Sequence, residues 1–261
     1  MVPTESIKET RFVKLRQFNL AMGVLHLVQG VLMLILSNDF TLPVQISLLN
    51  SAPGQGIVDG TETVVDLPIG PLVASFLFMS AIAHFSVSLG RGYPWYVNNL
   101  KKGINYARWY EYAASSSVMI IVIAMLCGIF EISALILIFS LNATMNLFGL
   151  IMELHNQTTK KTDWTSFIFG CFAGLMAWAV LGVYFFGAVL SAGDAVPTFV
   201  YFIFVSLAAF FNIFAVNMVL QYRGKGKYKD YLHGEKVYII LSLTAKSALA
   251  WQVFGGTLRG G

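Results

Sequence analysis

The sequence predicts an all-α membrane protein, a single bundle of seven transmembrane helices formed by residues 1–261. Composition is the first reason. Of the 261 residues, 57% are hydrophobic and only 11% are charged, whereas soluble domains carry about 25% charged residues. The second reason is that long apolar runs recur along the chain, and a spanning helix needs about 20 such residues. A water-soluble enzyme and a disordered chain are both excluded.

Seven apolar runs are long enough to cross a bilayer. They are Phe12–Leu36, Gly70–Leu89, Ile104–Cys127, Ile132–Leu154, Trp164–Leu190, Pro197–Gln221 and Val237–Thr257. Only Gly128–Glu131 separates the third run from the fourth, so these two runs are expected to form a helical hairpin with a tight turn. Pro71 and Pro197 stand at the start of the second and sixth runs, where a helix tolerates proline best.

Basic residues predict the orientation of the bundle. Fifteen of the 17 Lys and Arg precede the first run or lie around the second, fourth and sixth connections. The opposite side has only Arg259, and Lys246 lies within the seventh run. Because Lys and Arg favour the cytoplasmic side, we expect a multi-pass protein of the cell membrane with its N-terminus inside and its C-terminus outside. The small net charge of +4 does not favour nucleic-acid binding.

The first connection, Ser37–Ile69, is long, acidic and free of Lys and Arg, and it lies on the predicted outer side. Within it, Pro43–Leu49 and Glu62–Leu67 alternate in polarity or carry β-branched residues. A Pro/Gly-rich turn at Pro53–Gly60 separates the two segments. The pattern predicts a small extracellular β-hairpin within residues 38–69, and a loop without regular structure is the alternative.

Two charges lie where hydrocarbon should surround them. Lys246 is on the order of 15 Å from either end of its run, and an ammonium at the bilayer centre costs at least about 2.5–3.5 kcal/mol. Glu111 is the one carboxylate well inside a run, because Glu131 and Glu153 lie at helix ends and the other acids belong to loops. The depths of Lys246 and Glu111 differ by only about 5 Å. We therefore expect the two side chains to pair.

This pair has a structural and a functional interpretation. As a structural feature, a buried ion pair would fix helix packing while adding little stability. An ionisable pair inside a membrane is more often functional. A desolvated lysine is also a nucleophile that can form a Schiff base with an aldehyde. A protonated Schiff base would need a carboxylate counter-ion, and Glu111 is the sole candidate.

The seven runs, the lysine in the seventh and the motif RWYE from Arg108 resemble microbial rhodopsins, which bind retinal covalently. Four stretches are similar to heliorhodopsins in particular: SLTAKSALAWQVFGGTL from Ser242, RWYEYAASSSVMI from Arg108, FGCFAG from Phe169 and QYRGKGK from Gln221. The resemblance covers essentially the whole chain. A cytoplasmic N-terminus, predicted above from charge alone, distinguishes that family.

The resemblance implies all-trans retinal as the cofactor, carried by Lys246, with Glu111 as the Schiff-base counter-ion. Ser242, one turn before Lys246, stands where ion-pumping rhodopsins keep a second aspartate. The other residues expected around the chromophore are Tyr112, Ser115, Ser116, Met119, Asn142, Met145, Trp178, Phe210, Phe211 and Phe214; ordinary packing is the alternative for the aromatic ones. His26 and His84 are expected in a polar cytoplasmic-side cluster that accepts a proton, with hydrogen-bonded core histidines as the alternative.

The resemblance implies a light sensor and not an enzyme. Val122 lies eleven residues beyond Glu111, where a pump would carry a carboxylate donor, and no span has an acid or histidine in its outer half beyond Lys246. Because vectorial transport needs titratable groups on both sides, we expect negligible ion pumping. A light-gated proton channel or transporter and a retinal-free membrane interaction protein remain alternatives.

The expected partners are retinal, the lipid bilayer and a cytoplasmic signalling partner of unknown identity, with no metal and no nucleic acid. The resemblance also implies a homodimer built on the fourth and fifth helices together with the outer hairpin. Gly170 and Gly174 form a small-xxx-small pair on the fifth run, which permits close helix approach and favours self-association.

Overall fold

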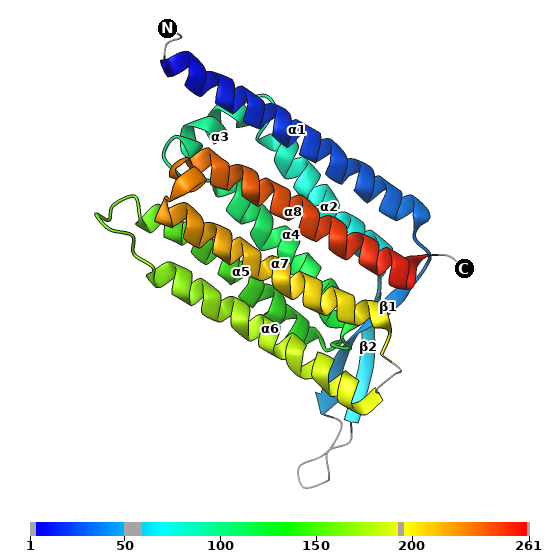
Figure 1. Cartoon of the computed structure of the whole chain (residues 1–261). Helices are drawn as coiled ribbons and strands as arrows, with labels where there is room; N and C mark the ends of the chain where they lie inside the picture. The colour runs from blue at the N-terminus through cyan, green and yellow to red at the C-terminus, as the bar shows by residue number, and fades with distance from the viewer. Residues whose placement is uncertain (1–3, 50–58, 193–195, 260–261) are drawn as a thin grey trace.

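The structure is a computed structural model that describes residues 4–49, 59–192 and 196–259, and it is a bundle of long helices with a small sheet at one end (Figure 1). The helices are α1 (Thr4–Leu36), α2 (Ile69–Ser86), α3 (Gly92–Leu100), α4 (Tyr106–Leu126), α5 (Ile132–His155), α6 (Thr165–Ala192), α7 (Thr198–Arg223) and α8 (Tyr231–Val253). The short turns η2 (Gly226–Lys229) and η3 (Phe254–Leu258) flank α8. Among the described residues, seven helices are long and apolar enough to cross a membrane. The predicted seven-helix fold is confirmed.

Two features of the helices differ from the prediction. Helix α8 begins at Tyr231, six residues before the predicted Val237, because the Asp230 side chain accepts a hydrogen bond from the backbone N–H of Leu232 at 3.1 Å and caps the helix. Helix α3 was not predicted. It is short and mixed in composition, and it is held by Tyr96 and Leu100, which lie one turn apart on its buried face.

The predicted hairpin of the third and fourth spans is present as α4 and α5. Gly128 makes the turn with a φ of +89°, a conformation that favours glycine. The Glu131 carboxylate then accepts a hydrogen bond from the backbone N–H of Ala134 at 3.0 Å, which caps α5. The two helices therefore pack side by side with only a tight turn between them.

The predicted β-hairpin is also present. Strand β1 (Thr41–Leu49) pairs antiparallel with β2 (Asp59–Pro68), with a bulge between Val44 and Gln45. Most of the predicted turn at Pro53–Gly60 lies outside the described residues. The sheet therefore lies between α1 and α2 in the chain, at the end of the bundle where α1 finishes (Figure 1).

Backbone hydrogen bonds connect several elements at this end. The N–H of Gln45 in β1 donates to the carbonyl of Phe130, in the turn between α4 and α5, at 2.8 Å. The N–H of Asn38, just after α1, donates to the carbonyl of Leu258, at the end of η3, at 3.2 Å. Main-chain bonds thus link α1, the hairpin, the α4–α5 turn and the end of α8.

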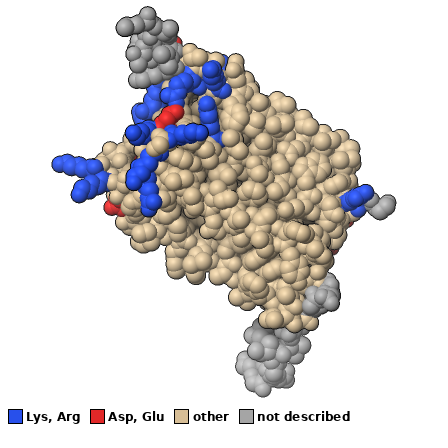
Figure 2. All heavy atoms as spheres, in the orientation of Figure 1, with Lys and Arg blue, Asp and Glu red and all other residues tan. Residues whose placement is uncertain are grey.

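Lys and Arg side chains gather at the other end of the bundle, where α1 begins (Figure 2). We name this end the basic end, and the end with the hairpin the sheet end. The basic end carries Arg11, Lys14, Arg16, Arg91, Lys101, Lys102, Lys160, Lys161, Arg223, Lys225, Lys227, Lys229 and Lys236, whereas Arg259 lies at the sheet end. Arg108 was counted with the connections, which is wrong, because it is buried at 6% exposure inside the bundle.

The two halves of the bundle differ in what they bury. The largest apolar cluster includes Phe76, Ile120, Ile123 and Leu249 and fills the half toward the sheet end. In the half toward the basic end, the buried side chains include the polar ones of Asn19, Asn105, Arg108, Glu153 and Glu235, and His84 is partly buried beside Asn19. Because a buried polar group is costly unless it is paired, the polar half is the place to look for function.

Candidate functional site

The site begins at the ion pair between α8 and α4. Lys246 Nζ donates to Glu111 Oε1 at 2.6 Å, and the two side chains are 3% and 9% exposed. Lys246 Nζ also donates to the Ser242 hydroxyl, one turn earlier in α8, at 3.0 Å. Glu111 is the acid beside Lys246, and Ser242 is neutral. The positive charge of the lysine is therefore balanced by one negative charge.

Residues of α1 and α2 surround the acid side of this pair. The Ser80 hydroxyl donates to Glu111 Oε1 at 2.7 Å, a contact that the sequence analysis missed. One turn further along α2, His84 Nδ1 lies 2.8 Å from Asn19 Oδ1. The rings of His26 and His84 stack with centroids 5.5 Å apart. The two predicted histidines thus lie together, His26 on α1 and His84 on the helix that carries Ser80.

An apolar cavity of about 340 Å³ lies among α4, α5, α6 and α7. Of the residues expected around a chromophore, Tyr112, Met145, Trp178, Phe211 and Phe214 line it. Its volume falls in the range of small-molecule pockets, about 300–1,000 Å³. The cavity therefore offers a binding space with aromatic walls.

A smaller cavity of about 50 Å³ joins Lys246 to this space. Lys246, Ser242, Met119 and Ser116 line it, and it shares Tyr112, Met145, Asn146, Phe211 and Phe214 with the large cavity. The amine of Lys246 thus stands at one end of a mostly apolar space that extends toward α6. A long apolar molecule attached to that amine would lie between the aromatic side chains.

Three of the expected residues line neither of these two cavities. Ser115 is buried, and Phe210 packs against the apolar core. Asn142 lies one layer back, where its side-chain amide donates to the hydroxyls of Ser116 at 2.8 Å and Ser117 at 3.0 Å. Asn142 therefore positions Ser116.

Other lining residues were missed by the sequence analysis: Trp109, Asn146, Gly149, Phe167, Met218 and Tyr238. Helical spacing was the available signal, since Asn146 lies one turn from Asn142 and next to Met145. Gly170 and Gly174 also line the cavity, and both pack against Met145 of α5 in the same chain. These glycines let α6 approach α5 within the bundle, and self-association stays a prediction.

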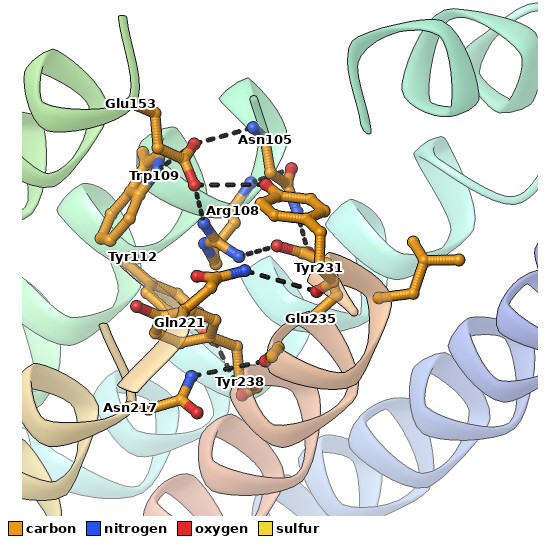
Figure 3. Close-up of polar contacts among 12 residues, drawn as sticks. Asn105, Arg108, Trp109, Tyr112, Glu153, Asn217, Gln221, Tyr231, Glu235 and Tyr238 are labelled. Atoms are coloured by element: carbon orange, nitrogen blue, oxygen red, sulfur yellow. Dashed lines mark hydrogen bonds and ion pairs between the residues drawn. The ribbon is translucent and has the colours of Figure 1, made fainter. Parts of the chain in front are cut away.

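A second charged cluster lies nearer the basic end (Figure 3). Arg108 forms ion pairs with both Glu153 and Glu235, and each of the two acids is 1% exposed. The prediction that Glu111 is the one carboxylate inside the spans is therefore wrong. Helix α5 continues to His155 and α8 begins at Tyr231, so both acids lie within helices.

A sequence signal for this cluster did exist. Glu235 precedes Ser242 by seven residues and Lys246 by eleven, so all three share one face of α8. Arg108 precedes Glu111 by three residues and shares a face of α4 with it in the same way. The early start of α8 hid the signal, because Glu235 was assigned to a loop.

A polar cavity of about 50 Å³ separates the two charged groups. Ser80, His84, Glu111 and Ser242 line it near the Lys246 pair, and Asn105, Arg108, Glu235 and Tyr238 line it near the second cluster. His26 does not line this cavity. The Lys246 pair thus has an apolar space on one side and a polar space on the other.

Acids and histidines are missing from α4 and α8 on the sheet-end side of the pair. In the described parts of α4 beyond Glu111 and of α8 beyond Lys246, no Asp, Glu or His follows toward the sheet end, and Val122 is fully buried in the apolar core. These two helices therefore offer no titratable acid or histidine that could relay a proton in that direction.

Comparison with protein families gives one result that covers almost all of the chain. The family model described as Heliorhodopsin matches residues 15–258. This range includes the Lys246 pair, both kinds of cavity and the Arg108 cluster. A search of curated protein sequences finds no match to the chain.

Proposed function

The chain belongs to the heliorhodopsin family, and from this premise we propose that it is a light-sensing photoreceptor in which Lys246 carries all-trans retinal and Glu111 is the counter-ion. Membership makes it a retinal-binding, rhodopsin-like protein that crosses the membrane several times. The observation that supports the assignment of residues is the position of Lys246. Its amine is buried, paired with one acid, and open to an apolar space.

The residues of this chain suit a long polyene. When bound, retinal supplies a chromophore whose shape changes on absorbing light, and the protein supplies its orientation and its electrostatic surroundings. Phe211, Phe214 and Trp178 would flank it in the large cavity. Tyr112 lies close to both ends of the site, since its ring is 5.4 Å from Lys246 Nζ and also borders the large cavity.

Glu111 would hold the positive charge at Lys246 in a fixed place. Ser80 and Ser242 contribute hydroxyls and not carboxylates, so one negative charge faces one positive charge. His84, one turn from Ser80 and hydrogen-bonded to Asn19, could receive a proton that leaves the pair. A change in the charge at Lys246 would then alter contacts among α1, α2, α4 and α8.

Sensing, and not ion pumping, is the activity we propose, with the basic end in the cytoplasm. Beyond Glu111 and Lys246, the described parts of α4 and α8 offer no acid or histidine toward the sheet end, whereas pumping needs titratable groups on both sides. Illuminated vesicles or cells should therefore show no sustained photocurrent. A photocurrent that reverses with the pH gradient would instead indicate a light-gated proton conductor.

Reconstitution tests the central assignment. Purified protein supplied with all-trans retinal should form a visible absorption band, and Lys246→Ala should form none. Lys102→Ala, at an exposed lysine of the basic end, is the matched control and should form the band normally. A visible band in Lys246→Ala would remove the assignment, and a colourless wild-type protein would leave a retinal-free interaction protein.

We further propose that the protein forms a homodimer and signals to a partner at the basic end. The family resemblance is the support for both. The molar mass of the detergent-solubilised protein, measured by light scattering, should correspond to two chains. The mass of a single chain at micromolar concentration would contradict the dimer.

A further inference from the structure

The Arg108 cluster has one more acid than base. Glu153 and Glu235 are both 1% exposed, and Arg108 is the one cation within ion-pair distance of either among the described residues. If both acids were ionised, the cluster would carry one uncompensated negative charge inside the bundle. A buried charge without a partner is strongly unfavourable. Binding one proton removes this charge.

The hydrogen bonds distinguish the two acids. Glu153 receives donors at both oxygens: the Arg108 guanidinium and the Tyr231 hydroxyl at Oε1, and the Asn105 N–H and the Trp109 indole N–H at Oε2 (Figure 3). An ionised carboxylate has about four lone-pair sites. Glu153 is therefore fully satisfied as a carboxylate and leaves no site for a proton.

Glu235 has fewer donors. It accepts one hydrogen bond from Arg108 at Oε1 and one from the Asn105 amide at Oε2, the latter at 2.7 Å. The Tyr231 hydroxyl also lies within hydrogen-bond reach of Glu235, so at least one lone-pair site is left over, and Glu235 lines the polar cavity whereas Glu153 does not. Glu235 thus has a free lone pair that can bind a proton, and this proton removes the excess negative charge of the cluster.

The polar cavity connects Glu235 to Glu111. Its volume of about 50 Å³ is sufficient for about one or two water molecules, which need two to four polar partners each. Arg108 Nε and the Tyr238 hydroxyl are buried polar atoms of lining residues, and neither has a hydrogen-bond partner among the described residues. Such atoms indicate bound water, so a chain of hydrogen bonds can extend from one acid to the other.

We propose that Glu235 is a second internal proton-binding site, which holds a proton at rest and transfers it through the polar cavity to Glu111 when the Lys246–Glu111 pair separates. This proposal rests on the proposed function, since light is what would separate the pair. The transfer breaks the O–H bond of the Glu235 carboxyl and forms an O–H bond on the Glu111 carboxylate. No electrons are exchanged. The negative charge moves from Glu111 to Glu235, and the cluster then carries the excess charge that the proton removes at rest, so the transfer lasts only while light keeps the pair apart.

The other titratable groups around Glu235 do not change the charge count. They are His84 of α2, Tyr96 of α3, Tyr112 of α4, Tyr222 of α7, and Tyr231 and Tyr238 of α8. Tyrosines are neutral at ordinary pH, and burial raises the pKa of Tyr96 still further. His84 bonds to Asn19 and forms no ion pair with Glu235 in the described part of the chain.

Infrared spectroscopy of the dark protein tests the resting state. A protonated carboxylic acid has a carbonyl band that a carboxylate lacks. Glu235→Gln should remove one such band, and so should Glu153→Gln, because either variant leaves one acid for one Arg108. Glu235→Asp should keep the band and shift it. Glu62→Gln, at an exposed strand position, is the control and should leave this band unchanged.

Three results in the dark would overturn the resting-state claim. They are no acid band in the wild type, a band that survives in Glu235→Gln, and a band that shifts in Glu153→Asp but not in Glu235→Asp. None of these needs retinal, so the outcome does not depend on whether a pigment forms. A failure of the proposed function and a failure of this inference are therefore seen separately.

Illumination of the pigment tests the transfer. The Glu235 band should decrease while a new acid band from Glu111 rises, and both changes should vanish in Glu111→Gln. If a pigment forms and responds to light while the Glu235 band stays constant, the transfer is refuted and the photoreceptor proposal stands.

Discussion

The Lys246 pair and the Arg108 cluster are built from the same two helices with the charges exchanged. In the pair, α4 supplies the acid Glu111 and α8 the base Lys246; in the cluster, α4 supplies the base Arg108 and α8 the acid Glu235. The difference is Glu153, a second acid that α5 adds to the cluster. The pair is electrically balanced, whereas the cluster has room for a proton. The Lys246 pair can therefore keep its two charges, whereas the Arg108 cluster can bind or release a proton.

The largest effect should come from removing Arg108. Arg108→Gln leaves two buried acids without a cation, whereas Lys246→Gln leaves one. Removing one partner of a buried ion pair costs about 3–5 kcal/mol, and we expect Arg108→Gln to lose at least this much in the free energy of unfolding. The thermal unfolding midpoint of the retinal-free, detergent-solubilised protein measures the loss. Lys102→Gln is the control at an exposed position, and an equal midpoint for Arg108→Gln and Lys102→Gln would contradict the expectation.

The second largest effect is a shift of the visible absorption band, which should distinguish Glu111 of α4 from Glu153 of α5. Glu111→Gln should move the visible band of the pigment to longer wavelength, because the positive charge at Lys246 loses its balancing carboxylate and spreads along the polyene. Glu153→Gln should leave the band close to its wild-type position, since Glu153 contacts Arg108 and not Lys246. An unshifted band in Glu111→Gln would show that another group is the counter-ion.

Asn105 allows a smaller change in the cluster. Its side-chain oxygen caps α4 by accepting from the N–H of Arg108 at 3.0 Å, and its amide donates to Glu235 at 2.7 Å. Loss of a cap costs about 1 kcal/mol and loss of a neutral hydrogen bond about 0.5–1.5 kcal/mol. Asn105→Ala should therefore lower the free energy of unfolding by about 1.5–2.5 kcal/mol. Asn105→Ser keeps a side-chain cap without the amide and should fall between wild type and Asn105→Ala, and an Asn105→Ser protein less stable than Asn105→Ala would contradict the contribution of the cap.

The smallest effect is expected at Glu131, a partly exposed acid outside the two buried sites. Hydrogen bonds from the Ser133 hydroxyl and from the Ala134 N–H lower the pKa of Glu131. A lowered pKa in the folded state stabilises the fold above the ordinary pKa of a glutamic acid, and this stabilisation is lost as the pH falls through the lowered pKa. Wild type should therefore exceed Glu131→Gln slightly in unfolding midpoint at neutral pH, and the two should converge in acid. A difference that grows in acid would contradict the assignment.

Periodicity and charge were sufficient to predict most of the fold from the sequence. Seven apolar runs, the Gly128 turn and the β-hairpin follow from patterns that extend over many residues. The pairing of Lys246 with Glu111 followed from depth in the membrane, because a buried base needs an acid at the same level. These features depend on local composition, which a single chain displays directly.

The Arg108 cluster could not be predicted in the same way. Its three charged residues come from three helices, and each lies within two turns of a helix end, where a charged residue normally meets solvent. Glu235 lies inside the bundle because α8 begins six residues earlier than the sequence predicted. The walls of the large cavity were predicted in part for a similar reason, since Asn142 and Phe210 have the right chemistry and the right helix but stand one layer away from the space.

The main-chain bonds at the sheet end limit how the helices can move. Gln45 fixes the hairpin to the α4–α5 turn, and Asn38 fixes the end of α1 to the end of α8. At the basic end, the described contacts between α4, α5 and α8 are mainly side-chain bonds around Arg108. The helices are therefore held in place at the sheet end. When one of them tilts, its other end, at the basic end, moves the furthest. A proton that leaves the Arg108 cluster would therefore weaken the side-chain contacts that hold these helices together at the end where they can move most.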